Sequence, residues 1–207
     1  HDTKSSEDVR MRLHVLSEMP GEWKTQLVRW MAANDKYKGI YEGQKVPDAN
    51  VEYLFYQTVL AIWPLEPFPE KDELQERIWS YLEKALRESK IHTNWINPNA
   101  EYEELVKKFV FSVIGSAEDN GFYKHFYPLQ KKISRLGMLN SLSALVLKLG
   151  SPGVVDTYQG NEIWNYCLVD PDNRRPVDFQ LLKEMLEELR RDLKDRGPEE
   201  LLQRLLT

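Results

Sequence analysis

Apolar residues recur three and four positions apart along most of the chain, which is the spacing of one face of an α-helix. Ser5 and Asp8 have the spacing of a capping box, so the first predicted helix begins near Ser5 or Ser6 and ends at Pro20. Further helices are expected on the apolar residues around 23–31, 51–62, 71–89, 99–113 and 129–149, with Gly137 as a candidate break, and again around 179–189 and after Pro198. Residues 34–50 are polar and contain two glycines and a proline, so they are predicted to form a loop.

The pattern changes after residue 149. Residues 150–153 form a turn cluster of glycine, serine and proline, residues 154–158 predict one short strand, and residues 170–176 predict a polar loop. A self-contained helical bundle has no reason to include such a unit. The sequence therefore predicts a mainly α protein in which residues 150–176 are one β/α step of a larger structure.

The composition restricts the class of protein. Hydrophobic residues make up 42% of the 207, enough to bury a core, and the single cysteine, Cys167, rules out a disulfide framework and fits a reducing compartment. The net charge of −5 arises from interspersed charges, which argues against nucleic acid as a partner, and no apolar run reaches the roughly 20 residues that span a bilayer. No secretory leader is visible, so we expect a cytoplasmic protein. Because the sequence opens without methionine, we also expect it to be a piece of a longer chain.

Few residues suggest chemistry by themselves. The four histidines show no pair at metal-ligand spacing, and there is no phosphate loop or nucleophile elbow, so we expect no metal and no cofactor. Two segments stand out. One is the adjacent pair His1 and Asp2, and the other is the run 170–178, which holds three carboxylates and two guanidiniums. Such groups give directed hydrogen bonds of the kind that read sugar hydroxyls, but the residues alone favour a salt-bridged loop for the run.

Three segments together resemble a known family. They are residues 1–8 (HDTKSSED), residues 92–99 (HTNWINPN) followed by Tyr102 and Glu103, and the pieces 140–142, Leu149, 151–154, 156–162 and 170–178. In this order and spacing they resemble the maltooligosyl trehalose synthases of the α-amylase family. Asn94, Asn161 and Cys167 depart from the residues that the family pattern leads us to expect.

The resemblance implies a fold. These enzymes are built on a (β/α)8 TIM-type barrel with the active site at the carboxyl ends of the strands. The chain would then be a helical insertion domain plus the last β/α unit or units of the barrel, with the strand near 154–158 as strand 8. The implied divisions are 1–19 (loop after strand 7 and first helix), 20–128 (helical insertion domain), 129–180 (strand 8 and substrate loop) and 181–207 (C-terminal helices).

The resemblance also implies an activity. The intact enzyme would be a glucosylmutase, an isomerase-type intramolecular glycosyltransferase, which converts the reducing-end α-1,4 linkage of a maltooligosaccharide to an α,α-1,1 linkage through a covalent glycosyl–enzyme intermediate. Asp2 matches the carboxylate that stabilises the oxocarbenium-like transition state. The remaining matches are substrate-binding positions: His1, Lys4, Tyr158, Glu162, Asp170, Arg174 and Arg175. The nucleophile and the acid/base would lie upstream of His1, so we expect the isolated chain to be inactive and to need the remainder of the parent enzyme as its partner.

In such a reaction, cleavage of the α-1,4 bond frees the reducing-end glucose, which must stay in the site and attack the covalent intermediate. Water must be excluded from the site, because otherwise it would hydrolyse the intermediate. We expect residues 20–128 to help wall off that pocket. Two other functions stay open at this point. One is a different α-amylase-family hydrolase or glucanotransferase, and the other is a non-catalytic helical interaction module.

Overall fold

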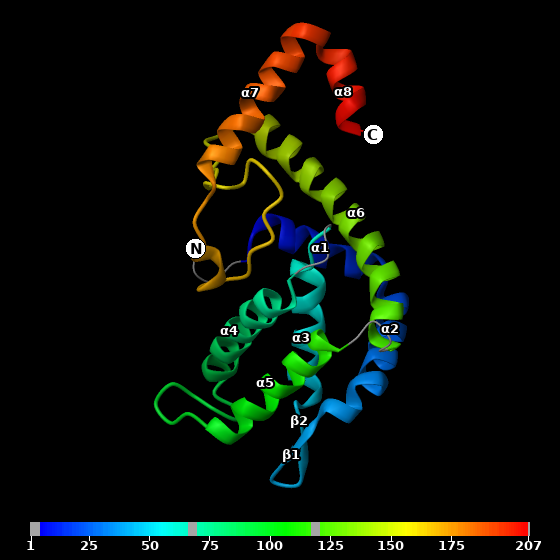
Figure 1. Ribbon diagram of the computed structural model, residues 1–207, viewed down its shortest axis with the longest axis vertical. Coiled ribbons are helices and arrows are strands. Elements are labelled where there is room, and N and C mark those ends of the chain that lie inside the picture. Colours follow the sequence, from blue (N-terminus) through cyan, green and yellow to red (C-terminus); the bar gives the residue numbers. More distant parts are fainter. Residues whose placement is uncertain (1–4, 66–69, 117–120, 207) are drawn as a thin grey trace. The chain divides into compact units, whose positions relative to one another are not determined.

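The computed structural model describes residues 5–65, 70–116 and 121–206, and these are mainly helical (Figure 1). The helices are α1 (Glu7–Glu18), α2 (Pro20–Asn34), α3 (Ala49–Ile62), α4 (Lys71–Ser89), α5 (Ala100–Gly115), α6 (Gly121–Gly150), α7 (Phe179–Arg196) and α8 (Pro198–Leu206), with 3-10 turns η1 (Asp35–Tyr37) and η2 (Asp172–Arg174). In the described part of the chain, no helix combines the length and the apolar character that crossing a membrane requires. The prediction of a mainly α chain is confirmed.

Most helix boundaries follow local sequence signals. Helix α4 begins and ends where predicted, α3 ends at Ile62 just before Trp63 and Pro64, and the Asn99 side chain caps α5 by accepting a hydrogen bond from the Tyr102 amide at 3.2 Å. The predicted break at Gly137 is wrong, because α6 runs through it without interruption. A helix tolerates an interior glycine when neighbouring packing supplies the stability that glycine lacks.

The predicted loop at 34–50 contains a small hairpin. Strands β1 (Gly39–Tyr41) and β2 (Gln44–Val46) pair antiparallel, with Gly39 opposite Val46. Glu42 and Gly43 connect them with φ values of 48° and 77°, the left-handed conformation that two-residue hairpin turns require. The loop prediction is wrong here because strands of three residues are too short for an alternation pattern to show.

The strand predicted at 154–158 does not form. Those residues have no regular structure, and the Val154 side chain is fully exposed. A strand is stabilised by hydrogen bonds to a neighbouring strand, and β1 and β2, which pair with each other, are the strands of the described residues. An apolar run alone therefore did not create a strand.

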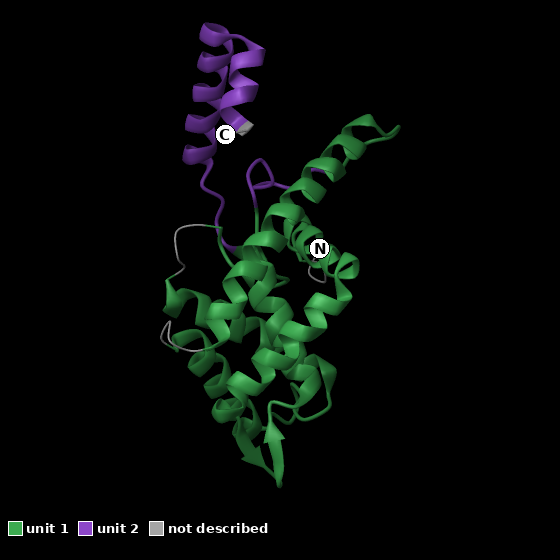
Figure 2. Ribbon diagram, turned by 90° about the vertical axis from the view of Figure 1, so that its right-hand side faces the viewer, with its two compact units in different colours: residues 1–155, 165–174 green, residues 156–164, 175–207 purple. Residues whose placement is uncertain are grey.

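The chain divides into two compact units (Figure 2). Unit 1 comprises residues 1–155 and 165–174, and its core surrounds α3, most of whose residues are buried. Aromatic rings fill this core: Trp30 of α2 packs against Tyr56 of α3 and Phe122 of α6, with ring centroids 5.4 and 5.5 Å apart. Unit 2 comprises residues 156–164 and 175–207, in which Arg204 of α8 pairs with Asp192 and, at 2.7 Å, with Glu188 of α7.

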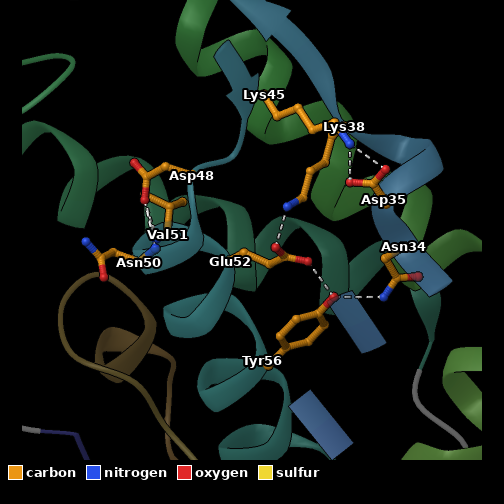
Figure 3. A network of polar contacts seen from close by, with 9 residues as sticks. All are labelled: Asn34, Asp35, Lys38, Lys45, Asp48, Asn50, Val51, Glu52 and Tyr56. Carbon is orange, nitrogen blue, oxygen red and sulfur yellow. Dashed lines mark hydrogen bonds and ion pairs between the residues drawn. The ribbon is translucent and has the colours of Figure 1, made fainter. Parts of the chain in front are cut away.

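A polar network is buried beside the hairpin (Figure 3). Lys38 Nζ lies 2.5 Å from Glu52 Oε2, the Tyr56 hydroxyl donates to Glu52 Oε1 at 2.9 Å, and Asn34 Nδ2 donates to the Tyr56 hydroxyl at 3.0 Å. Burial and the nearby Glu52 carboxylate raise the pKa of Tyr56 well above its ordinary value, so the hydroxyl stays protonated and able to donate. The network joins the end of α2 to the first turns of α3.

Candidate functional site

The segment Asn165–Arg174 lies against the start of α1. The Ser6 amide donates to the Cys167 carbonyl at 2.9 Å, the Ser6 hydroxyl donates to the Asn165 carbonyl, and the Cys167 amide donates to that hydroxyl at 3.2 Å. The Asp8 carboxylate accepts from the Asn165 amide at 2.7 Å. The residues that directly follow 1–4 in sequence are therefore fixed beside the segment that leads to Asp170.

Helix α4 holds the same segment from another side. Arg77 Nε lies 2.8 Å from Asp172 Oδ1, and Arg77 Nη2 donates to Asp172 Oδ2 at 3.1 Å and to the Tyr166 carbonyl at 2.8 Å. The Leu168 amide also donates to Asp172 Oδ2, at 2.7 Å. The Asp172 carboxylate is buried. It accepts hydrogen bonds from the Leu168 amide of its own segment and from Arg77 of α4, and the positive charge of Arg77 offsets its negative charge.

Two of the predicted substrate-binding residues lie together next to the Arg77–Asp172 ion pair. Asp170 and Arg174, four positions apart in sequence, form an ion pair. Lys84 of α4 donates to the Asp170 carbonyl at 3.1 Å, and its Nζ lies 3.6 Å from Asp170 Oδ2. The Arg174 side chain is 70% exposed, so its planar set of donors faces solvent while Asp170 orients it. An exposed guanidinium held in this way can donate two parallel hydrogen bonds to adjacent hydroxyls.

A buried arginine of α1, Arg12, contacts the Asn165–Arg174 segment through the Tyr166 ring. Arg12 of α1 is fully buried, its Nη1 donates to the carbonyls of Ala61 and Trp63 at 3.0 and 2.6 Å, and its guanidinium lies 3.5 Å from the centroid of the Tyr166 ring. Burial lowers the pKa of Arg12 and raises the pKa of Tyr166 from their ordinary values. The cation stacked on an aromatic face links the end of α3 to the Asn165–Arg174 segment.

The other predicted positions lie elsewhere. His1, Asp2 and Lys4 lie outside the described residues. Tyr158, Glu162 and Arg175 belong to unit 2, where Glu162 Oε2 accepts from the Gly160 amide at 2.8 Å and Tyr158 is 46% exposed.

Sequence reasoning missed the residues that position the segment, namely Ser6, Asp8, Arg12, Arg77, Lys84 and Asp172. Asp172 lies in the charge-rich run 170–178, which did not distinguish it from Asp170, and Arg12 left a signal of its own. It lies three residues after Val9 on the buried face of α1, and a charged residue on an apolar stripe indicates a buried polar contact.

Comparison with known proteins connects this geometry to a family. No protein-family model matches the chain. Over 182 residues, 86% of this chain, it is 37% identical to a Mycobacterium tuberculosis protein named "Putative maltooligosyl trehalose synthase", of which it covers 21%. A crystal structure of a maltooligosyl trehalose synthase matches 93% of this chain at 39% identity with a TM-score of 0.78, and the synthase of Arthrobacter ramosus matches 91% at 35% identity with a TM-score of 0.73. The chain spans 25% and 22% of those two structures.

These matches cover 86–93% of the chain. At 35–39% identity they reflect common descent as well as a common fold. The chain is therefore similar along most of its length to a segment of the maltooligosyl trehalose synthases, a segment that makes up about a quarter of their length or less, and this is consistent with a fragment of such a protein.

Proposed function

We propose that the chain is part of an enzyme that converts the reducing-end α-1,4 linkage of maltooligosaccharides to an α,α-1,1 linkage by intramolecular transglucosylation. The observation that carries this proposal is the similarity to maltooligosyl trehalose synthases along 86–93% of the chain. The chain spans about a fifth to a quarter of those relatives, so the activity belongs to the intact enzyme.

Within that enzyme, the chain supplies the sugar-holding side of the site. Asp2 serves as the carboxylate that stabilises positive charge developing on the reacting glucose, with His1 beside it and Lys4 on the released glucose. Asp170 and Arg174, together with Arg175, bind a glucose further along the donor side of the substrate, and Tyr158 and Glu162 shape the mouth of the barrel. The hydrogen bonds between Ser6 and the Asn165–Cys167 stretch support this arrangement, because they tie the sequence after Asp2 to the sequence before Asp170.

The nucleophile and the general acid/base come from the remainder of the parent enzyme, as does the rest of the barrel to which residues 129–180 contribute. The exposed leucines in the second half of α6 support the need for such a partner. Leu139, Leu142, Leu145 and Leu149 recur at helical spacing and are about half exposed or more. A continuous apolar stripe of this kind is normally covered, and we assign its cover to the remainder of the enzyme.

Incubation with maltopentaose tests the proposal. We expect the full-length parent to remove reducing ends without releasing glucose, and the 207-residue chain to leave the sugar unchanged. Asp2→Asn in the parent should abolish conversion, whereas Asp195→Asn, on an exposed part of α7, should not. Release of shorter maltooligosaccharides with new reducing ends would favour the alternative, an α-amylase-family hydrolase. Activity of the chain alone would mean that its own carboxylates include the nucleophile.

The helices between residues 20 and 128 have a second proposed role, which is to keep water from the trapped glucose. Support comes from α4, which lies in this range and fixes the Asn165–Arg174 segment through Arg77 and Lys84. Loosening this contact with Arg77→Met in the parent should raise the ratio of hydrolysis to transglucosylation. An unchanged ratio in a folded variant would remove the support.

A further inference from the structure

The connection between α4 and α5 presents apolar side chains at its tip. Trp95 is 55% exposed, and Ile91 and Ile96 are more exposed still. The connection projects beyond the C-terminal end of α4 (Figure 1). Isolated exposed apolar residues are ordinary, but three within six positions, one of them a tryptophan, form a local patch.

This tip rests on a fixed polar frame. The Asn94 side chain accepts from the amides of Ile96 and Asn97 at 3.0 and 2.8 Å, which closes the turn that carries Trp95. Buried Thr93 donates to Glu103 at 2.6 Å and accepts from the Asn99 amide at 2.9 Å. Because these bonds fix the backbone on both sides of Trp95, they lower the cost of ordering this turn when a ligand binds.

A cation fixes one face of the indole ring. The Arg87 guanidinium lies 5.0 Å from the Trp95 ring centroid. Arg87 is itself held by two bonds to Glu103, at 2.9 and 2.7 Å, and by one to Glu83 at 2.8 Å. With one face backed by Arg87 and more than half of the side chain exposed, the ring offers a flat apolar platform to solvent.

Helix α4 joins this platform to the candidate site. Arg77 and Lys84 contact the Asn165–Arg174 segment, and Arg87 follows Lys84 by three residues on the adjoining part of the same helix face. A linear ligand that leaves Asp170 along α4 would therefore run toward Trp95. An oligomer of repeated units suits this arrangement better than a single small molecule.

We propose that Trp95, with Asn97 beside it, is a surface binding site for an α-1,4-glucan chain, separate from the Asp170–Arg174 pair. A glucose ring has an apolar C–H face that can stack on an indole ring. The stacking is favoured by dispersion attraction between the two surfaces and by removal of their apolar area from water. Its rim of hydroxyls needs groups that both donate and accept, as the exposed Asn97 amide does. The ligand class rests on the proposed function, but the binding itself does not require catalysis.

Affinity electrophoresis of the 207-residue chain tests this site directly. Native gels are run with soluble amylopectin, with dextran as an α-1,6-linked control, and without polymer. We expect amylopectin, and not dextran, to retard the chain, and Trp95→Ala to weaken this retardation by about tenfold in apparent affinity. Trp95→Phe, which keeps a ring, should lose less. Ile40→Ala removes a comparably exposed apolar side chain from β1 and should change nothing.

Each result has a distinct meaning. Absence of retardation of the unmodified chain, or equal retardation of Trp95→Ala and the unmodified chain, overturns the glucan site and makes the tip a contact for another part of the enzyme. Circular dichroism of each variant shows whether the fold is kept, and Trp95→Phe decides the matter if Trp95→Ala unfolds. Conversion of maltopentaose by the full-length parent is scored separately, so failure of this site leaves the proposed activity standing.

Discussion

Arg77 of α4 and Asp172 of the Asn165–Arg174 segment meet through two bonds, Nε to Oδ1 at 2.8 Å and Nη2 to Oδ2 at 3.1 Å, although 95 positions separate them in sequence. The Asp172 carboxylate is 3% exposed and Arg77 is 17% exposed. A pair this enclosed contributes little net energy when it is complete, because both charges gave up water. Loss of Arg77 is costly, because the buried Asp172 carboxylate then loses both of its bonds to the guanidinium.

Arg77→Met should therefore destabilise the chain clearly. We expect a loss of roughly 2–4 kcal/mol in the free energy of unfolding, somewhat below the cost of breaking a fully buried pair because Arg77 keeps some contact with water. Urea unfolding followed by circular dichroism measures it. Lys45→Met is the matched control: its 2.6 Å pair with Asp35 is half exposed on both sides, and about 0–1 kcal/mol is expected. Equal losses in the two variants would contradict the structural role of the Arg77–Asp172 pair.

The helices of this fold were largely predictable, because their signals are local. The apolar stripe of α3, the Asn99 cap of α5 and the limits of α4 all act within a few residues. The start of α1 shows where local reasoning fails. Its N-cap residue Ser6 makes no side-chain cap bond, and Ser6 and Asp8 instead bind Asn165, more than 150 positions away. The same polar side chains satisfy either role, and only tertiary packing decides between them.

Gly137 illustrates the same limit and provides a second prediction. A Cβ at this position would lie 2.7 Å from Arg12 Cγ and 3.0 Å from the Arg12 Cα, so the glycine in α6 permits a close approach of α1. Gly137→Ala should destabilise the chain by roughly 1–3 kcal/mol, since backbone atoms of α1 would have to shift. Gly21→Ala in α2 meets nothing within 4 Å and should stabilise by about 0.5–1 kcal/mol through helix propensity. Thermal unfolding of both variants shows whether the two shifts have opposite signs.

The stability of the chain should depend on Glu103 in acid. The hydrogen bond from Arg87 lowers the pKa of Glu103 below its ordinary value of 4.5, against the opposing effect of burial, and Thr93 adds to the lowering. A carboxyl with a lowered pKa stabilises the fold above its unfolded pKa, and the contribution is lost as the pH falls from about 4.5 through the folded pKa.

The Glu103→Gln variant should therefore be less stable than the unmodified chain at pH 7. The difference between their free energies of unfolding, called the gap below, should narrow as the pH falls toward 3. Urea midpoints between pH 7 and pH 3 measure the gap. Glu101→Gln is the control, because Glu101 is exposed in the first turn of the same helix. A gap for Glu103→Gln that stays constant across this range would show that its carboxylate charge does not stabilise the fold.

The candidate site was predictable in part. The charge-rich run 170–178 stood out by itself, the family resemblance singled out Asp170 and Arg174 within it, and the structure places these two in an ion pair. The run alone did not separate them from Asp172, which is buried and bound to Arg77. Aspartates two positions apart in sequence have identical chemistry, and their different roles follow from the position of α4. Helix α4 is nearly a hundred residues earlier, where no local pattern connects it to the run.

Arg174 provides the sharpest test of the sugar-binding assignment. Its guanidinium is mostly exposed and is oriented by Asp170, so its removal should cost the fold little and substrate binding much. We expect Arg174→Lys in the full-length parent to lower kcat/KM for maltopentaose by about tenfold or more, because an ammonium cannot reproduce two parallel hydrogen bonds to neighbouring hydroxyls. The free energy of unfolding should change by less than about 1 kcal/mol. Arg190→Lys, on an exposed part of α7, should leave both quantities unchanged. If Arg174→Lys retains the kcat/KM of the unmodified enzyme, the pair with Asp170 is a surface salt bridge and the sugar must be held by other residues.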